Sequence, residues 1–317
     1  MTPTATSRRE HWLLMLSFAS IYIIWGSTYL AIRFAVESIP PLVVAGLRHL
    51  TAGSVLLVWA LARGYRPTKR EVRSCIVLGA LFFLIGHGTL HWAETLVPSG
   101  LSALLVATEP MWVAVLGLFI SHETKFTPMN VTGLIIGFIG VALLSTDKAA
   151  LGGSFVGAIV ILAGTLAWSL GMLYSGNASM PRDPIARAAL PVFFGGIMLL
   201  VAAAVAGEFR GLTTAAFTIK ATAGLLYLIV FGSIVAFTAY TWLLERTSPV
   251  FLATHTYVNP IVAVLLGWLL AGESINGRVA IAGAMVVLSV MFVSVKTVSS
   301  SQLPGSSEGE NRGAAAD

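Results

Sequence analysis

The chain has 317 residues, of which 56% are hydrophobic and only 10% are charged. Soluble domains carry about 25% charged residues, so this composition excludes a soluble enzyme. The formal net charge of +5 does not indicate a nucleic-acid partner. Nucleic-acid-binding proteins gather basic residues on a water-exposed face, whereas here they lie in loops between hydrophobic runs.

Ten hydrophobic stretches follow one another along the chain, and we interpret each as a transmembrane helix. They are residues 11–32, 41–62, 74–93, 98–121, 126–146, 149–181, 188–207, 221–244, 247–272 and 279–295. Arg48 and Glu109 are charged residues inside the second and fourth stretches. The segment 1–10 precedes the first stretch, and the Ser/Gly/Glu-rich tail 298–317 has a composition typical of disorder. The single cysteine, Cys75, can form no internal disulfide bond.

The distribution of basic residues predicts the orientation of the chain. With a cytoplasmic N-terminus, the cluster from Arg63 to Arg73 and most other Lys and Arg residues fall on the cytoplasmic side, as the positive-inside rule requires. Arg8 and Arg9 precede the first stretch as they would in a signal peptide, but that stretch is too long and lacks a clear cleavage site. We therefore expect a multi-pass protein of the bacterial cytoplasmic (inner) membrane with both termini in the cytoplasm.

An internal repeat is visible when residues 92–123 are compared with residues 242–273. The matched pairs are Trp92 and Trp242, Ala103 and Ala253, Pro110 and Pro260, Leu116 and Leu266, Gly117 and Gly267, and Glu123 and Glu273. Trp25 has a plausible counterpart in Trp168. Five helices per half is an odd number, so the second half enters the membrane from the opposite side. The predicted fold is all-α and integral to the membrane, with ten transmembrane helices as two inverted five-helix repeats (11–146 and 149–297), an architecture typical of secondary transporters.

An ordered set of motifs supports a family assignment. The set comprises the segment 24–29 (Ile-Trp-Gly-Ser-Thr-Tyr), Arg48, the pairs Glu109-Pro110 and Asn259-Pro260, and the endings Gly117 to Glu123 and Gly267 to Glu273. With these residues, the chain resembles the EamA-type transporters of the drug/metabolite transporter (DMT) superfamily over about residues 14–295. The resemblance implies a ten-helix inner-membrane protein whose central cavity opens alternately to each side. It does not name a substrate.

Glu109 is the sharpest candidate for a functional residue. It lies near the middle of the bilayer, where an ionised acid costs about 2.5–3.5 kcal/mol or more, so it must face the protein interior. Its roles are reversible protonation coupled to transport, pairing with an amine of the substrate, or a structural pairing with Arg48 or a histidine. Asn259 is its counterpart in the repeat. The following prolines, Pro110 and Pro260, predict two helix breaks that line one cavity or, alternatively, only kink the packing.

Arg48 lies about 10 Å from the outer end of the second stretch, at 1.5 Å per residue. Its planar guanidinium suits a carboxylate or a phosphate, and it equally suits neutralisation of Glu109 or bonds to backbone carbonyls. We favour the structural role. Arg33 and Glu37 are spaced four residues apart near the outer end of a helix, which predicts a surface ion pair.

His87 and His91 share one helical face at a spacing of four residues. This spacing fits cavity lining, proton relay, ordinary hydrogen bonding between helices or two ligands of a metal ion. We favour cavity lining over a metal site, because a metal needs further ligands and no glutamate of the zincin type falls between the two histidines. His255 and Tyr257 are further lining candidates. His49 and His122 have the sequence context of interfacial residues.

Aromatic and small residues complete the candidate site. Ser27 and Tyr29 in the first stretch are candidates for the cavity lining. Trp25 and Trp168, deeper in their stretches, fit cavity lining and ordinary packing equally. The small-residue motif from Gly133 to Gly137 predicts either an internal helix contact or the seam of a homodimer.

The function predicted from these features is a secondary transporter. Because the chain lacks a Walker A motif, we expect a permease, with export favoured, that moves small metabolites such as amino acids or drug-like compounds by alternating access. Protons are the coupling ion considered, the lipid bilayer is the surroundings, and neither a cofactor nor a nucleic acid is expected. The alternative is an intramembrane metal-dependent enzyme that uses His87, His91 and Glu109.

Overall fold

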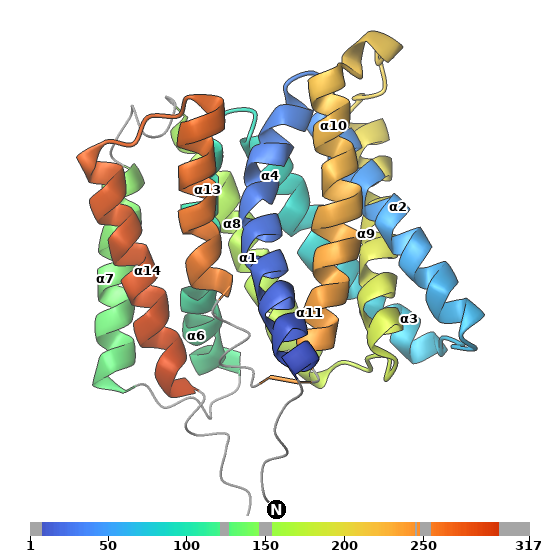
Figure 1. The fold of residues 1–317 in the computed structure, drawn as a ribbon, viewed down its shortest axis with the longest axis horizontal. Helices are drawn as coiled ribbons and strands as arrows, with labels where there is room; N and C mark the ends of the chain where they lie inside the picture. Colours follow the sequence, from blue (N-terminus) through green and yellow to red (C-terminus); the bar gives the residue numbers. More distant parts are fainter. Residues whose placement is uncertain (1–7, 121–126, 146–153, 245, 248–254, 298–317) are drawn as a thin grey trace, which may run out of the picture.

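The computed structural model describes residues 8–120, 127–145, 154–244, 246–247 and 255–297, and within these ranges it contains helices and no strand. The helices are α1 (Arg8–Val36), α2 (Pro41–Ala62), α3 (Lys69–Leu78), η1 (Gly79–His87), α4 (Gly88–Ala93), α5 (Ser99–Val106), α6 (Glu109–Ile120), α7 (Pro128–Ser145), α8 (Phe155–Asn177), α9 (Pro184–Val205), η2 (Thr214–Ala216), α10 (Ile219–Tyr227), η3 (Leu228–Val235), α11 (Ala236–Leu244), α13 (His255–Ala271) and α14 (Gly277–Thr297). The start of α1 and the end of α14 lie at the same end of the bundle, the lower end in Figure 1.

The helices have the composition of a membrane protein. Seven of the described helical segments are long and apolar enough to cross a membrane. Three shorter apolar helices, Pro128–Leu144, His255–Ala271 and Gly277–Val293, accompany them. The prediction of an all-helical membrane protein is therefore confirmed.

Several helices begin earlier than the hydrophobic stretches, because polar side chains cap them. The third span begins at Lys69 rather than at residue 74: Thr68 Oγ1 accepts from the Glu71 amide, and Glu71 accepts from the Thr68 amide at 2.7 Å. Asp183 accepts from the Ala186 amide at the start of α9 in the same way. Such caps satisfy amides that the first turn leaves without partners, so a helix continues into a charged segment that hydropathy excludes.

Two spans contain a π-helical segment at equivalent places. η1 follows α3 and η3 follows α10, and the two starting helices begin at Lys69 and Ile219, 150 residues apart, each after a threonine cap. A π-helical turn shifts the hydrogen-bond register of a helix and is frequent at functional sites. The second pair of equivalent helices, α2 and α9, are 22 residues long and begin at Pro41 and Pro184.

The contact between α2 and α9 is built from a reciprocal pair of glycines. A Cβ on Gly53 would lie 2.5 Å from the Phe193 amide nitrogen, and a Cβ on Gly196 would clash with the backbone of Leu50. The offset of 143 residues that relates Gly53 to Gly196 also relates Leu50 to Phe193. Each helix thus offers the same kind of small residue to the same place on the other helix, and the two backbones approach closely.

The small-residue motif on α7 forms an internal contact. Gly133 faces Phe292 and Ser289 of α14, and Gly137 faces Ser289 and Met111. The faces of these glycines are therefore covered within the chain, so they provide no homodimer seam.

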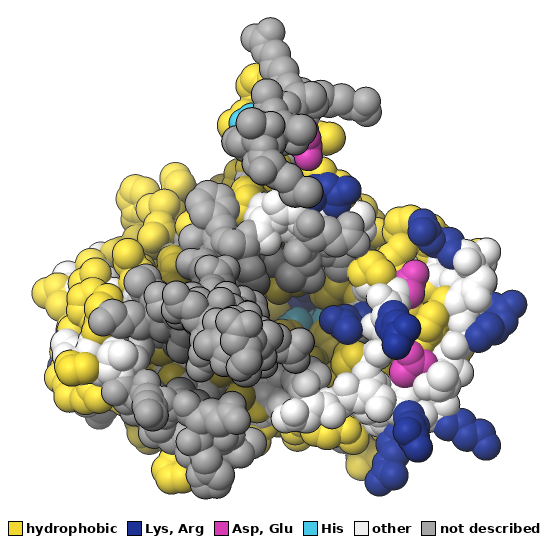
Figure 2. Space-filling view, turned by 90° about the horizontal axis from the view of Figure 1, so that it is seen from below, with side chains coloured by type: hydrophobic (Ala, Val, Ile, Leu, Met, Phe, Trp, Pro, Cys, Tyr) yellow, Lys and Arg dark blue, Asp and Glu magenta, His cyan; other side chains and the backbone are white. Residues whose placement is uncertain are grey.

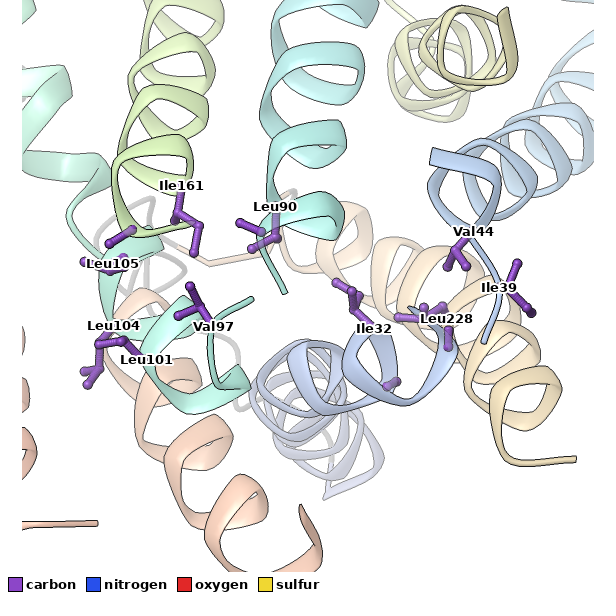
Figure 3. Close-up of a cluster of buried hydrophobic side chains, with 14 of the residues drawn as sticks. Ile32, Ile39, Val44, Leu90, Val97, Leu101, Leu104, Leu105, Ile161 and Leu228 are labelled. Carbon is purple, nitrogen blue, oxygen red and sulfur yellow. The ribbon is translucent and has the colours of Figure 1, made fainter. Parts of the chain in front are cut away.

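The two ends of the bundle differ. Toward the upper end, hydrophobic side chains from α1, α2, α4, α5, α8 and η3 meet in one buried cluster (Figure 3). Ile32, Leu90 and Ile161 are at most 7% exposed within it. From below, by contrast, Figure 2 shows a recess beside the basic side chains, with histidine atoms visible inside it. Among the described residues, the upper part of the bundle is therefore packed with hydrophobic side chains.

The predicted ion pair between Arg33 and Glu37 is wrong. Glu37 pairs with Lys220 at 2.7 Å, and Arg33 donates to the backbone oxygen of Glu94 at 2.6 Å. Partners from distant parts of the chain replace the local one, because both side chains lie where α10 and the end of α4 pack against α1.

Candidate functional site

Two aromatic clusters lie against the two π-helical segments. Trp168 of α8 packs on Phe82 with ring centroids 4.5 Å apart and stacks on His87 at 5.1 Å and 13°. Trp25 of α1 packs against Tyr240 at 5.2 Å and against His255 at 5.1 Å. Both tryptophans are half-buried. Each therefore presents aromatic surface inside the bundle rather than at a membrane interface.

The π-helical segment η3 supplies polar contacts to both α1 and α2. The Trp25 indole donates to the Gly232 carbonyl at 3.1 Å. Arg48 Nε donates to Ser233 Oγ at 3.0 Å. A Cβ at Gly232 would meet Arg48 Nη2 at 3.3 Å and Thr28 at 2.9 Å, so only glycine leaves room for this arrangement.

Arg48 is 5% exposed and joins α2 to η3. No ion pair links it to Glu109 in the structure. The guanidinium thus bonds a hydroxyl of a neighbouring helix, a partner that differs from Glu109 and from the backbone carbonyls considered from the sequence. Ser233, its partner, carried no signal in the sequence beyond being a serine in a hydrophobic stretch.

A row of histidines connects α2 with η1 and α4. His87 Nδ1 lies 2.7 Å from His49 Nε2, and His91 Nδ1 lies 2.7 Å from the His87 carbonyl. The interfacial placement of His49 is wrong, because this residue is 2% exposed. His49 shares one face of α2 with other buried residues at helical spacing (Ala45, Ala52, Leu56). This spacing in the sequence could have indicated that His49 is buried. His122 lies outside the described residues.

Glu109 begins α6, immediately after the helix breaks at Ala107 and Thr108. Its side chain is half-buried, and Ser169 of α8 donates to its backbone oxygen at 3.3 Å. The Tyr29 and Tyr240 hydroxyls lie within the electrostatic reach of its carboxylate. Among the described residues, tyrosines of α1 and α11 are within the electrostatic influence of Glu109, and no ion pair holds its carboxylate.

Asn259 lies on α13 and ties this helix to α1. With its amide oriented to suit its neighbours, it donates to the carbonyls of His255 at 3.1 Å and Tyr22 at 3.3 Å. The predicted break at Pro260 is wrong within the described helix, because α13 is continuous from His255 to Ala271. Pro260 lies in its second turn, close to the helix start, where a missing amide bond disturbs little of the helix. Pro110 is in the first turn of α6, directly after the break that was expected there.

The remaining candidates surround these groups. Ser27 on α1 bonds the Tyr227 hydroxyl of α10 at 2.7 Å. Tyr29, His255 and Tyr257 are half-buried on α1 and α13. Among the described His, Cys, Asp and Glu side chains, no three come together as a metal site, and His87 meets His49 rather than Glu109.

Two acids that the sequence did not single out as site residues lie near the upper end. Glu94 is completely buried at the end of α4, and Glu273, between α13 and α14, accepts hydrogen bonds from the start of α5. Glu273 was noted only as a repeat position. Its repeat partner, Glu123, lies outside the described residues.

The model of the EamA-like transporter family matches two stretches of the chain, residues 12–146 and 155–295. The chain belongs to the EamA-like transporter family. It is 36% identical over 278 residues to the uncharacterized inner membrane transporter YedA of Escherichia coli (strain K12), a match that covers 87% of this chain and 89% of YedA. It is 28% identical to the uncharacterized transporter YoaV of Bacillus subtilis, covering 90% of this chain and 98% of YoaV.

More distant similarities agree with this assignment. Protein PecM of Dickeya dadantii is 26% identical, over 85% of this chain and 88% of PecM. One crystal structure matches with a TM-score of 0.59 and 20% identity, over 89% of this chain and 96% of that chain, which shows the fold alone. The EamA-like protein is thus a membrane transporter of the DMT type, and its family membership points to transport rather than catalysis.

Proposed function

We propose that this protein is a secondary transporter that exports small metabolites, such as amino acids or drug-like compounds, by alternating access. The observation that carries the proposal is the half-buried placement of Glu109, Tyr29, Trp25 and Trp168 on helices of the bundle. Polar groups beside aromatic rings suit a zwitterion with an apolar side chain, because each part of such a molecule finds a matching surface.

We further propose that the bundle consists of two inverted five-helix repeats. The two separate matches to the family model, the equivalent π-helical segments and the reciprocal glycines of α2 and α9 support this arrangement. Two related halves can rock about one fixed site, which is the mechanism expected of inverted repeats.

The proposed orientation places the lower end in the cytoplasm. Lys and Arg side chains gather on that end (Figure 2), and the segment from Arg63 to Arg73 lies there. By the positive-inside rule, the upper end, where the buried hydrophobic cluster lies, then faces outward.

The test of the proposed function is counterflow into proteoliposomes against a pooled metabolite library, read by mass spectrometry. We expect a defined subset of compounds to exchange across vesicles that contain the protein and none to exchange across empty vesicles. Glu109→Gln should abolish or uncouple exchange of these compounds while membrane insertion stays normal, because it removes an ionisable group from the middle of a span. A library that shows no exchange in the wild type would contradict the proposed function.

A further inference from the structure

A single carboxylate joins the end of α13 to the start of α5. Glu273 Oε1 accepts from the Ser99 amide at 2.7 Å and from the Ser99 hydroxyl at 2.8 Å, and Oε2 accepts from the Gly100 amide at 2.9 Å. A negative charge is stabilised at a helix N-terminus, where amides have no partner within the helix. Because Glu273 belongs to the second half of the chain and α5 to the first, these bonds hold the halves together at the upper end.

Glu94 is a buried carboxyl group without a partner. The residue is 0% exposed, and neither carboxyl oxygen has a hydrogen-bond partner among the described residues. The Arg33 guanidinium donates instead to the backbone oxygen of Glu94. Burial of an ionised carboxylate without partners costs several kcal/mol, so the neutral acid is the stable form in this state.

The charged and titratable groups around Glu94 come from several elements. They are Arg33 and Tyr29 on α1, Arg48 on α2, His87 on η1, His91 on α4 itself, and Glu273 before α14, while α8 carries no charged side chain. Glu94 follows the span that ends at Ala93. Burial and the charge of Glu273 raise the pKa of Glu94, while Arg33 and Arg48 act in the opposite direction. The Nε2 atom of His91, one turn earlier on α4, is also buried and has no partner among the described residues.

We propose that Glu94 is the binding site of a proton coupled to transport, and that this proton keeps Glu273 bonded to the N-terminus of α5. Release of the proton leaves a carboxylate at Glu94 and a second negative charge close to Glu273. Repulsion between the like charges weakens the bonds from Ser99 and Gly100 to Glu273. The upper end then opens, and water reaches the newly charged Glu94. Protonation reverses these steps and closes the end.

The proposal rests on the proposed transport function, but its first test needs no substrate. Infrared spectra of the purified protein at acidic and alkaline pH report the C=O stretch of protonated carboxyl groups. We expect a carboxyl band that disappears at alkaline pH in the wild type and is absent from Glu94→Gln at every pH. Glu94→Asp keeps a titratable group and should keep a band. The unchanged wild-type band in Glu94→Gln would overturn the proposal.

The second test measures the opening itself. Spin labels are placed on cysteines at Leu96 and Ser274, exposed residues on either side of the Glu273 contact, in a Cys75→Ala background. We expect the distance between the labels to shift from short to long as the pH rises in otherwise wild-type protein. Glu94→Gln should keep the short distance at every pH, and Glu273→Gln should show no dependence on pH.

Two matched controls locate the effect. Glu208 Oε2 also accepts from amides at a helix start, those of Leu42 and Val43 at 2.9 and 3.1 Å, so Glu208→Gln should keep the wild-type pH response. Glu109→Gln should keep it as well. Loss of the response in Glu109→Gln, or its persistence in Glu94→Gln, would overturn the assignment to Glu94. Counterflow remains a separate measurement, so failure here leaves the proposed transport function standing, and failure of counterflow leaves the protonation site standing.

Discussion

At the scale of single residues, the hydrogen bond between Arg48 and Ser233 is a buried polar contact between α2 and η3. Arg48 is buried, and Ser233 accepts from its Nε atom. We expect Ser233→Ala to destabilise the protein by about 1–3 kcal/mol, because it leaves a buried charged donor without its acceptor. Thermal unfolding of the purified protein in detergent measures the loss.

A double-mutant cycle isolates this interaction. Arg48→Met removes the donor, so adding Ser233→Ala to that variant should cost much less than Ser233→Ala alone, with a coupling of about 0.5–3 kcal/mol. Additive effects of the two substitutions would mean that Ser233 stabilises the protein through something other than Arg48.

The sequence predicted the types of the central residues better than their partners. Arg48, His87, His91 and Glu109 stand out because polar groups are costly inside a hydrophobic stretch, and the structure places all of them inside the bundle. Partners are decided by packing between helices, which one sequence does not reveal. Glu37, for example, bonds Lys220 of a distant helix rather than its neighbour on α1.

At the scale of elements, hydropathy predicted the existence of the helices but not their internal register. The stretch 98–121 appears uniform, yet it divides into α5 and α6 at Ala107 and Thr108. Hydropathy does not predict the two π-helical segments either, because it reports contact with lipid and not the carbonyl to which each amide donates. Pro110 indicates its helix break only approximately, because the break lies before it, at Ala107 and Thr108. Pro260 indicates no break, because it lies within a continuous helix.

The contact between α2 and α9 gives a prediction at this scale. Gly196→Ala places a methyl group against the backbone of Leu50, and backbone atoms cannot move aside as a flexible side chain can. We expect a loss of about 1–3 kcal/mol in stability, from overpacking, and a lower melting temperature. Gly53→Ala should have a similar effect, since its new Cβ meets the backbone of Phe193.

Gly176 is the matched control for these substitutions. It lies in helix α8, but a Cβ there has no heavy atom within 4 Å. Gly176→Ala should therefore leave the melting temperature unchanged or raise it slightly, because alanine favours helices. Equal melting temperatures for Gly196→Ala, Gly53→Ala and Gly176→Ala would show that α2 and α9 are not in close contact.

At the scale of the whole molecule, the two halves share a scaffold but not a chemistry. The offset of 143 residues pairs Trp25 with Trp168. Each tryptophan contacts the π-helical segment of the other half of the chain, Trp25 at Gly232 and Trp168 at Phe82. Six charged or imidazole residues of the first half, at offsets of 143 or 150 residues, have uncharged counterparts in the second half. The residues are Arg48, His49, His87, His91, Glu94 and Glu109, and their counterparts are Pro191, Val192, Phe237, Thr241, Leu244 and Asn259. The second half contributes other titratable groups, among them His255 and Glu273, so the two halves carry different ionisable residues on a similar scaffold.

The orientation of the molecule is the last prediction, and single cysteines test it. The native Cys75 is 0% exposed, so it should not react with a membrane-impermeant maleimide. A cysteine at Thr213, exposed in the connection between α9 and α10 at the upper end, should react in intact cells. A cysteine at Ser179, exposed between α8 and α9 at the lower end, should react only after permeabilisation.

These labelling results follow from the distribution of charge. Moving the segment from Arg63 to Arg73 outward would carry a dense positive cluster across the membrane, which the positive-inside rule opposes. Reaction of both cysteines in intact cells would contradict a bundle whose two ends face different compartments. The reverse pattern would place the upper end, where Glu273 bonds the start of α5, in the cytoplasm.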